Sequence, residues 1–282
     1  MSISTSVKTV DRLVEIIDSF SSSEPAWTLT GLSRRLDVPK STLHRFLVSL
    51  EAHGILRQDE ESKRWCLGYR LLVWGKLAEE STPLHQIARP VMQDLVSDTG
   101  ETALLTVYAS REVICVEKAE TSHPVRLALD AGSRRPPHAG ASSKILMAHL
   151  PEGEVEAIIR EQGLPRLCVN TITDAEELKK ELARIREQGY ARSYQETDQG
   201  AWGIATPIRD WQGEVVAAIG IAGPTSRFGE EVAQAYVSRC KQAADRISSS
   251  LFARPLSDGE VAASGQAEHH THGTPDVMGE ET

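Results

Sequence analysis

The chain has 282 residues, a formal net charge of −9 and four cysteines. A chain of this length is expected to form about two domains, each with room for a core. The polar N-terminus holds no signal-peptide core, and no apolar run is long enough to cross a membrane, so we expect a cytoplasmic protein with no membrane partner. The cysteines lack paired spacing, which argues against a disulfide framework or a zinc site and predicts reduced thiols. We expect no cofactor and no bound metal.

The charge is unevenly distributed along the chain. Residues 1–75 contain ten Lys and Arg against nine Asp and Glu, so the remainder carries a net charge of −10. A near-neutral head is compatible with nucleic-acid binding only where its positive charges gather on one face. We therefore expect modest affinity for DNA per subunit, and a gain from assembly into at least a dimer.

Residues 7–20 have the apolar spacing of an amphipathic helix. We expect this helix to pack beneath the two helices that follow it. Its predicted apolar stripe consists of Val10, Leu13, Val14, Ile17 and Phe20.

The stretch from Thr28 to Gly54 predicts a helix-turn-helix, two short helices joined by a tight turn. Thr28 is suited to cap the first helix and Gly54 to end the second. Between them, Asp37 tolerates the left-handed conformation of a sharp turn, and Pro39 suits the first position of a new helix. The apolar positions at helical spacing are Leu29, Leu32 and Leu36 in the first helix and Leu43, Phe46, Leu47 and Leu50 in the second.

The second of these helices begins with short donors and positive charge, which suit DNA because a recognition helix enters the major groove N-terminus first. Residues 55–57 and 64–68 then predict a β-hairpin wing, whose acidic tip at Asp59, Glu60 and Glu61 limits it to a positioning role. The alternative is an ordinary helical hairpin whose polar face is only solvated. The candidate DNA contacts are Thr28, Arg34, Lys40, Ser41, Thr42, His44, Arg45, Lys63 and Arg64.

The remaining chain mixes helical and strand patterns and predicts an α+β fold, with a sheet flanked by helices. Helices are expected over 69–80, from Pro83 to Gly100, from the end of the loop 130–144 through Leu150, and over 228–251. Thr173 and Glu176 predict a capping box for a further helix that ends before Gly189. Strands are expected over 101–109, 113–118, 125–129, 190–196, 204–209 and 214–222.

A series of motifs runs in order along nearly the whole chain. They are VPKSTLHRFLVSLEAHGIL after the turn, WCLGYRLLVWG after the wing, TGET at 99–102, RRPPHAGASSKILMAHLP at 134–151, IREQGYARSYQETDQGAWGIATPIRD at 185–210 and VVAAIGIAGP at 215–224. With these motifs, the chain from about Ser6 to about Leu251 resembles the isocitrate-lyase-regulator (IclR) family of bacterial transcription factors.

The resemblance implies a sequence-specific regulator that binds a palindromic operator in double-stranded DNA as a homodimer or homotetramer. It also implies four segments: a winged helix-turn-helix domain at 1–70, a helical linker at 71–82, an effector-binding domain of GAF-like topology at 83–252, and a disordered tail at 253–282. We expect a repressor of a catabolic operon. An activator is the alternative within the family.

In the family that the chain resembles, the effector lies in a cavity over the sheet of the second domain. The positions that match the family's lining are Leu127, Ala141, Ser142, Ser193, Ala201, Gly203, Gly220 and Ala222. Gly203 stands where a Cys is usual, Gly220 and Ala222 where small hydroxyl residues often occur, and Ser193 where an acid is frequent. These departures predict a cavity that is roomier and more apolar than is usual in the family. Trp202 is expected to stack on a flat ligand or, as the favoured alternative, to pack in the core.

The residues Ser142 and Ser143 open a helix, whose backbone N–H groups and hydroxyls favour a carboxylate. We therefore expect a small organic or aromatic acid, with its apolar body against Leu127 and Ala201. The alternative is that the serines only cap the helix.

Two other functional classes remain open from the sequence. His138 near Ser142, Ser143 and Lys144 offers a nucleophile and a base, but no Gly-x-Ser-x-Gly elbow and no third group accompany them, so we expect no enzyme; a hydrolase with a fused winged domain is the alternative. The second of these classes is a protein-interaction module, in which the winged helix binds another protein rather than DNA. The histidines of the tail, His269, His270 and His272, are expected to hold no functional metal.

The expected mechanism is a two-state coupling. The effector closes the cavity, and the helices between Tyr69 and Gly100 transmit the change to the separation of the two recognition helices.

Overall fold

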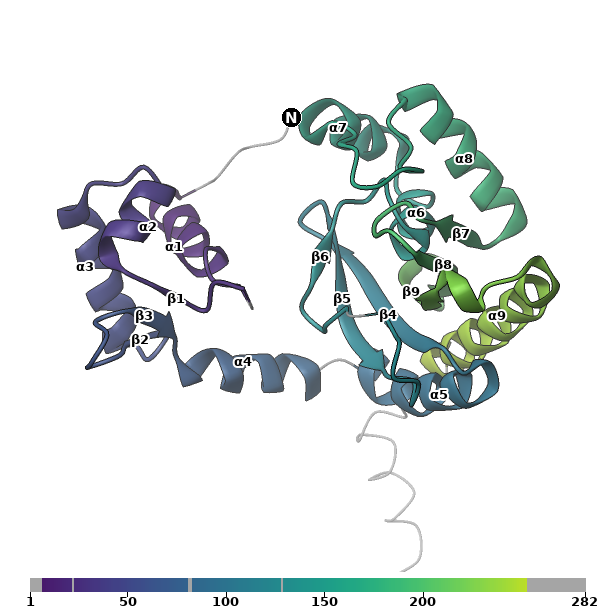
Figure 1. The fold of residues 1–282 in the computed structure, drawn as a ribbon, viewed down its shortest axis with the longest axis horizontal. Coiled ribbons are helices and arrows are strands. Elements are labelled where there is room, and N and C mark those ends of the chain that lie inside the picture. The colour runs from purple at the N-terminus through teal and green to yellow at the C-terminus, as the bar shows by residue number, and fades with distance from the viewer. Residues whose placement is uncertain (1–6, 22, 81–82, 128, 253–282) are drawn as a thin grey trace, which may run out of the picture. The chain divides into compact units, whose positions relative to one another are not determined.

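The computed structural model of the 282-residue chain describes residues 7–21, 23–80, 83–127 and 129–252. The chain divides between His85 and Gln86 into two compact units (Figure 1). The predicted tail at 253–282, with its three histidines, lies outside the described residues.

The first unit is a winged helix-turn-helix, as predicted. Its helices are α1 (Lys8–Asp18), α2 (Leu29–Arg35) and α3 (Lys40–Ala52), and its strands are β1 (Ala26–Trp27), β2 (Leu56–Gln58) and β3 (Trp65–Leu67). The strands are antiparallel in the order β1-β3-β2, and β2 and β3 form the wing. The short β1, which pairs Trp27 with Trp65, was not predicted.

Local signals in the sequence set the helix ends of this unit. The Thr28 hydroxyl accepts a hydrogen bond from the Gly31 N–H at 3.0 Å and so caps α2. Asp37 has φ +50° in the turn and Gly54 has φ +68° after α3, both left-handed as predicted. Pro39 is the N-cap of α3 rather than its first helical residue, one position earlier than predicted.

The apolar stripes of α2 and α3 face the core of this unit. Leu32, Leu43, Leu47 and Leu50 are buried there together with Trp65. The stripe predicted for α1 is only half right. Ile16 is the buried residue of that helix, whereas Val10 and Val14 are 54% and 51% exposed. The true stripe is Leu13, Ile16 and Phe20, because these residues contact the core under α2 and α3.

Two helices follow the wing, α4 (Tyr69–Glu80) and α5 (Pro83–Thr99), with the bounds that their apolar spacing and Pro83 predict. The helix α4 leaves a row of large apolar side chains exposed. These side chains are Tyr69, Leu72, Val73, Trp74 and Leu77.

The second unit is built on one antiparallel sheet of six strands in the order β6-β5-β4-β9-β8-β7. The strands are β4 (Thr102–Ala109), β5 (Glu112–Ala119), β6 (Arg134–Arg135), β7 (Ala191–Tyr194), β8 (Ala201–Arg209) and β9 (Val215–Pro224). The helices are α6 (Ala141–Met147), α7 (Glu152–Gln162), α8 (Ala175–Gln188) and α9 (Glu230–Phe252), with the 3-10 turn η1 (Thr225–Arg227) before α9. The α+β class is therefore confirmed.

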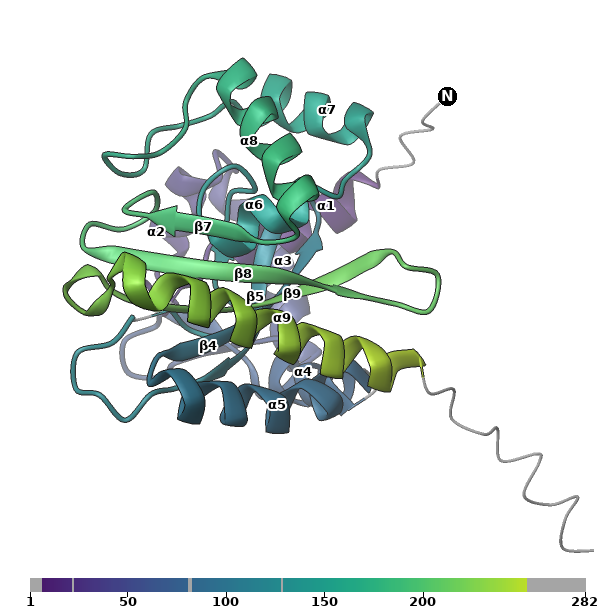
Figure 2. The same ribbon diagram turned by 90° about the vertical axis from the view of Figure 1, so that its right-hand side faces the viewer.

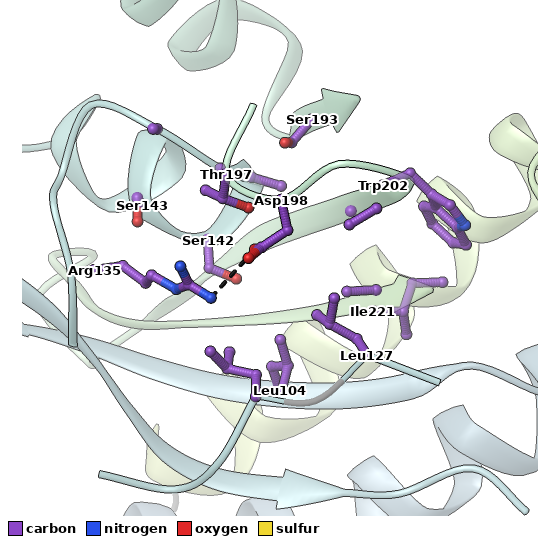
Figure 3. Close-up of a pocket in the computed structure, with 17 residues that line it drawn as sticks. Leu104, Leu127, Arg135, Ser142, Ser143, Ser193, Thr197, Asp198, Trp202 and Ile221 are labelled. Carbon is purple, nitrogen blue, oxygen red and sulfur yellow. Dashed lines mark hydrogen bonds and ion pairs between the residues drawn. The ribbon is translucent and has the colours of Figure 1, made fainter. Parts of the chain in front are cut away.

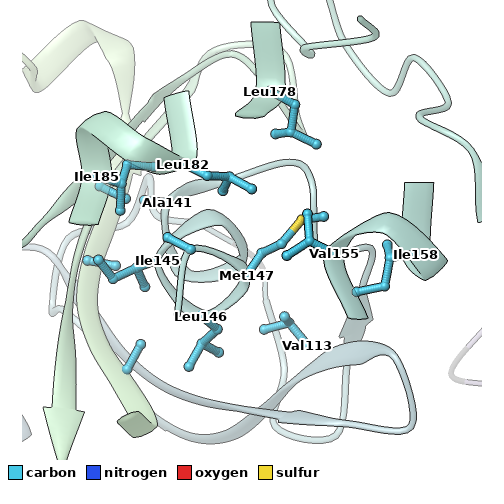
Figure 4. Close-up of a cluster of buried hydrophobic side chains, with 14 residues drawn as sticks. Val113, Ala141, Ile145, Leu146, Met147, Val155, Ile158, Leu178, Leu182 and Ile185 are labelled. Carbon is cyan, nitrogen blue, oxygen red and sulfur yellow. The ribbon is translucent and has the colours of Figure 1, made fainter. Parts of the chain in front are cut away.

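Helices cover both faces of this sheet (Figure 2). The helices α5 and α9 lie side by side on one face, joined where the Tyr236 hydroxyl donates to the Thr99 carbonyl at 3.1 Å. The helix α6 lies on the other face, with α7 and α8 packed over it (Figure 4). Its close approach is possible because the strands present small side chains there, among them Ala191, Ala205 and Ala218.

Three predictions for the second unit were wrong. The described residues of 125–129 are not a strand. The helix α8 is capped by Asp174, whose carboxylate accepts the Glu177 N–H at 2.8 Å, so the capping box with Thr173 is off by one residue. The helix α7 was not predicted, although Pro151 and the acidic first turn Glu152 and Glu154 are ordinary signals of a helix start.

Candidate functional site

The first turns of α3 form an exposed polar surface on the first unit. Leu43, Leu47 and Leu50 turn inward and fix the orientation of the helix. The opposite side is exposed, and all five residues predicted at its start lie on it: Lys40, Ser41, Thr42, His44 and Arg45. This surface therefore combines hydroxyl donors, an imidazole and two cations at a helix N-terminus, which is the arrangement that a recognition helix needs.

The other predicted DNA contacts are also exposed: Thr28, Arg34, Lys63 and Arg64. Two of them take part in local structure as well. The Thr28 hydroxyl is used as the cap of α2, and Lys63 has φ +54° at the tip of the wing. Beside it, the Asp59 carboxylate accepts the Ser62 hydroxyl and the Ser62 N–H at 2.6 and 2.8 Å. The Ser62 hydroxyl bond is the largest cause that lowers the pKa of Asp59. The acidic tip thus shapes the wing turn, in keeping with a positioning role.

The second unit contains a cavity of about 70 Å³ between its sheet and the start of α6 (Figure 3). Its wall includes most of the predicted positions, and they come from separate parts of the chain. These are Leu127, Ala141, Ser142, Ser193, Ala201, Gly203 and Ala222. Three of them are cross-strand neighbours, because Ser193 pairs with Gly203 and Gly203 with Ala222. They therefore share one face of the sheet, the face that α6 covers.

Gly220 does not line the cavity, contrary to the prediction. A Cβ atom built on Gly220 would lie 2.3 Å from the Ile204 carbonyl oxygen, so the neighbouring strand leaves no room for a side chain. Gly203 is different, because a Cβ there would meet the Ala141 Cβ at 3.5 Å, an ordinary contact. Only at Gly203 does the missing side chain enlarge the cavity.

Trp202 belongs to the core rather than to a stacking platform. Its ring lies between Phe228 and Tyr236, with centroids 4.5 and 5.6 Å away, and its Nε1 donates to the Pro224 carbonyl at 3.1 Å. Figure 3 shows the ring directed away from the cavity toward α9. The ring thus packs in the core, the alternative that the sequence favours, although Trp202 is also among the residues that line the cavity.

The cavity is small rather than roomy. A water needs roughly 10–15 Å³ of such volume, so the space corresponds to roughly five water-sized positions. Leu104, Leu129 and Ile221, which have larger side chains, also line the cavity. A ligand with few heavy atoms fits without movement of the wall, and a larger one requires the wall to move.

The cavity wall also contains an ion pair that the sequence analysis missed. The Arg135 Nη2 donates to the Asp198 Oδ2 at 3.2 Å, across the mouth of the cavity and beside Ser142 (Figure 3). The two residues are 63 positions apart, so no local pattern links them. The only signal was their presence in two of the motifs, RRPPHAG and QETDQG.

A buried ionic network holds the start of α6 against the loop between β7 and β8. The Lys144 Nζ contacts Glu196 at 2.6 Å and Glu181 at 3.2 Å, and the side chain of Lys144 is 2% exposed. Glu196 also accepts the Gly140 N–H at 3.0 Å. Burial acts to raise the pKa of Glu181, but the charge of Lys144 and bonds from Arg184 and Lys144 hold it below its ordinary value. The network therefore fixes the cavity wall at Ala141 and Ser142.

His138 is held by the loop that follows α7. One of its ring nitrogens lies 3.0 Å from the Pro165 carbonyl oxygen, and burial lowers the pKa of the imidazole. Within the described part of the chain, no hydrogen bond joins His138 to Ser142 or Ser143, so a serine–histidine pair is not formed.

The described residues contain no cluster of three potential metal-ligating side chains. None of the helices described here is both long and apolar enough to span a bilayer. The four cysteines are free, and burial raises the pKa of Cys115 to about 11, so this thiol is unreactive at neutral pH.

The chain is similar to known regulators in both units. Residues 9–60 match the IclR helix-turn-helix domain, and residues 77–249 match the family described as bacterial transcriptional regulator IclR C-terminal. The regulator BhcR of Paracoccus denitrificans is 33% identical over 248 residues, 88% of this chain and 88% of BhcR. The transcriptional repressor AllR of Salmonella typhi is 32% identical over 246 residues, 87% of this chain and 90% of AllR.

A solved structure has the same fold over most of the chain. It is an IclR homologue from Microbacterium hydrocarbonoxydans complexed with 4-hydroxybenzoate, with a TM-score of 0.73 and 29% identity over 86% of this chain and 98% of that one. Together with the winged unit and the six-stranded second unit, these matches show that the chain belongs to the IclR family of bacterial transcriptional regulators.

Proposed function

We propose that this chain represses a catabolic operon by binding a palindromic operator, and that a small organic acid modulates this binding. The exposed polar start of α3 is the observation that carries the proposal. The name of AllR, a repressor, supports the sign of regulation. The 4-hydroxybenzoate bound to the Microbacterium hydrocarbonoxydans homologue supports an acid as effector.

The residues of α3 have separable roles in this proposal. Arg45 and Lys40 bring positive charge to the groove, where Arg pairs bidentately with guanine and either cation contacts phosphate. Ser41 and Thr42 donate to phosphate or base edges from the first turn, where the helix N-terminus favours a phosphate. Their buried neighbours keep the helix rigid, so the contacts are preorganised.

Replacing Arg45 by Ala is expected to weaken operator binding by roughly 5- to 150-fold, the loss of about 1–3 kcal/mol for one specific contact. Fluorescence anisotropy with the chain's own promoter DNA and with random DNA measures both affinities across a salt series. The matched control is Arg160→Ala, which removes the same charge from an exposed helix of the second unit, where the cation pairs with Glu161. The control should bind as wild type does.

Equal binding of promoter and random DNA by the wild type would contradict the proposed DNA recognition. So would equal loss in both variants, because the effect would then reflect net charge alone. Binding that does not weaken with salt would favour the protein-binding class of winged helix, since phosphate contacts release counterions.

A second copy of the chain is the proposed partner of the apolar face on α4. Leu72 is 72% exposed, Trp74 45% and Leu77 58%. An apolar surface of this kind on a helix marks an interaction site. A homodimer or homotetramer built on it would present two α3 helices to the two halves of a palindrome.

Replacing Leu72 by Glu is expected to halve the mass of the assembly, because a charge is placed in an apolar interface. Sedimentation equilibrium measures the mass, and Leu167→Glu, an exposed leucine of the second unit, is the control. A wild type that sediments as a monomer, or a Leu72 variant of unchanged mass, would contradict this interface.

The effector acts through a population shift in this proposal. It stabilises one arrangement of the cavity wall, and the helices α4 and α5 carry the change to the spacing of the paired α3 helices. Coupling of this kind typically amounts to about 1–3 kcal/mol, or roughly a 5- to 150-fold change in operator affinity. An acid that binds the protein and leaves operator affinity unchanged would contradict the coupling.

A further inference from the structure

The ion pair at the mouth of the cavity has the geometry of an anion site whose anion is supplied by the protein itself. We propose that Arg135 is the anchor for the effector's carboxylate, and that Asp198 occupies this anchor until the effector replaces it. The inference rests on the proposed function, since it requires the second unit to bind an organic acid. It names the group that recognises the acid and the exchange by which it binds.

The distribution of charge around the cavity supports this assignment. Among the described residues that line it, Arg135 and Asp198 alone are charged; the others are apolar or carry hydroxyl groups. A guanidinium holds five N–H donors in a planar fork that matches a carboxylate, so an acid with an apolar body finds its complement at Arg135. Ser142 lies beside the pair and supplies a hydroxyl donor to the second carboxylate oxygen (Figure 3).

The pair is able to exchange because it is partly solvated. The side chains of Arg135 and Asp198 are 34% and 43% exposed, and ion pairs of this kind contribute little to stability. The neighbouring Lys144–Glu196 pair is 2% and 9% exposed and is held by further bonds, so it cannot open at similar cost. Of the two carboxylates near the cavity, only Asp198 is free to give way.

The two members of the pair also lie in different kinds of structure, one in a strand and the other in a loop. Arg135 is fixed in β6, where it pairs with Val113 of β5. Asp198 lies in the loop between β7 and β8, two residues before Gly200 at φ +73°. Because loops are more mobile than strands, we expect Asp198 rather than Arg135 to move when a competing carboxylate binds.

The start of α6 is a poorer carboxylate site than the sequence suggests. The helix is seven residues long, and the Gly140 N–H in front of it is already bonded to the Glu196 carboxylate at 3.0 Å. A second carboxylate at this point would be repelled by Glu196. The structure therefore assigns the carboxylate to Arg135 and leaves Ser142 as an auxiliary donor.

Isothermal titration calorimetry with opposite-acting variants tests the proposal on the full-length protein. The probes are propanoate, butanoate, benzoate and 4-hydroxybenzoate, each paired with its neutral primary amide. Arg135→Gln is expected to weaken binding of the carboxylates on the order of tenfold to a hundredfold, and Arg135→Lys by less, since it keeps the charge and loses the fork. Asp198→Asn is expected to strengthen the binding of the carboxylates by up to about fivefold, because this change removes the competing carboxylate of the protein.

The control variant is Arg134→Gln, the other cation of β6, which pairs with Glu112 and does not line the cavity. It should leave every affinity unchanged, and neither Arg135→Gln nor Asp198→Asn should change the weak binding of the amides. A lower carboxylate affinity in Arg135→Gln together with a higher one in Asp198→Asn supports the exchange. If the pair were merely structural, removing either partner would lower the affinity.

The outcomes separate this inference from the function it rests on. Equal carboxylate affinity in wild type and Arg135→Gln would overturn the anchor alone, as would a loss in Asp198→Asn as large as that in Arg135→Gln. Failure of the wild type to bind any of the acids would overturn the effector class and the anchor together.

Discussion

Replacing Lys144 by Met is expected to destabilise the second unit by about 3–5 kcal/mol, the cost of removing one partner from a buried ion pair. The change removes the cation that bridges Glu196 and Glu181. Arg184 still pairs with Glu181, but Glu196, whose side chain is 9% exposed, loses its ion pair. Methionine has nearly the same length as lysine and fills the space, so the loss measures charge rather than a cavity. Urea unfolding followed by fluorescence and circular dichroism gives the free energy.

The pH dependence of this variant has a definite sign. In the wild type the pKa of Glu181 is held below its ordinary value of about 4.3, so its stabilising contribution is present at neutral pH and is lost as the pH falls through the lowered pKa. Without Lys144, the charge that lowers this pKa most is removed, while burial still raises it and the bonds from Arg184 still lower it. The variant therefore loses less stability on acidification than the wild type does, so the difference between them should shrink from pH 7 toward pH 4.

Two further variants make the result decisive. Lys179→Met removes an exposed lysine of α8 that pairs with Glu156 and Glu176, and it should cost less than about 1 kcal/mol. Lys144→Met combined with Glu196→Gln should recover part of the loss, because the uncompensated charge is removed. A Lys144→Met protein as stable as wild type at neutral pH, or a loss that grows on acidification, would contradict the electrostatic account.

Much of the first unit could be predicted because its signals are local. Thr28, Asp37 and Gly54 each act within a few residues of their own position, as a cap, a left-handed turn and a helix end. The stripe of α1 was harder, since Val10 and Ile16 are equally apolar and only the direction of the core decides which is buried. The strand β1 depends on a pairing of Trp27 with Trp65 across 38 positions, which no window of sequence contains.

The cavity was predictable in outline and not in its chemistry. The family motifs predict that Ser193, Gly203 and Ala222 share one cavity wall; all three line the cavity, and the strand register explains why they meet. The misplaced residue, Gly220, lies on the same strand as Ala222, but the close approach of β8 leaves no space beside it. The pair of Arg135 and Asp198 needs the whole sheet in place before the two side chains meet.

Residues 125–129 show how tertiary contacts override a local pattern. Alternating apolar residues predicted a strand, but the Val125 carbonyl accepts from the Arg227 Nη1 at 2.8 Å instead of joining a ladder. Arg227 also forms two bonds to the Glu101 carboxylate, at 2.8 and 2.6 Å. One arginine thus ties the cavity wall at Leu127 to the start of β4 and to η1.

Replacing Arg227 by Ala is expected to cost about 3 kcal/mol, near the lower end for a broken buried pair because the arginine itself is 28% exposed. The loss arises at Glu101, whose side chain is 2% exposed and which would be left charged and unpaired. The Glu101 carboxylate lies against Gly223, in space that a side chain there would fill, since a Cβ on Gly223 would lie 2.3 Å from its oxygen. The same change frees the Val125 carbonyl, so the affinity for a carboxylate probe such as butanoate should fall as well.

The comparison of single and double variants decides whether the stranded charge is the cause. Glu101→Gln should cost less than Arg227→Ala, because the arginine left behind is able to reach water. Adding Glu101→Gln to Arg227→Ala removes the unpaired charge, so the free energy of unfolding should return toward the wild-type value. The affinity for butanoate should stay low, because the wall at Leu127 still lacks its bond to Arg227. Arg246→Ala, which breaks the exposed pair with Asp94, is the matched control and should cost at most about 1 kcal/mol. If Arg227→Ala and Arg246→Ala lost the same stability, burial of Glu101 would not be the determinant, because the two pairs differ mainly in the exposure of their acids.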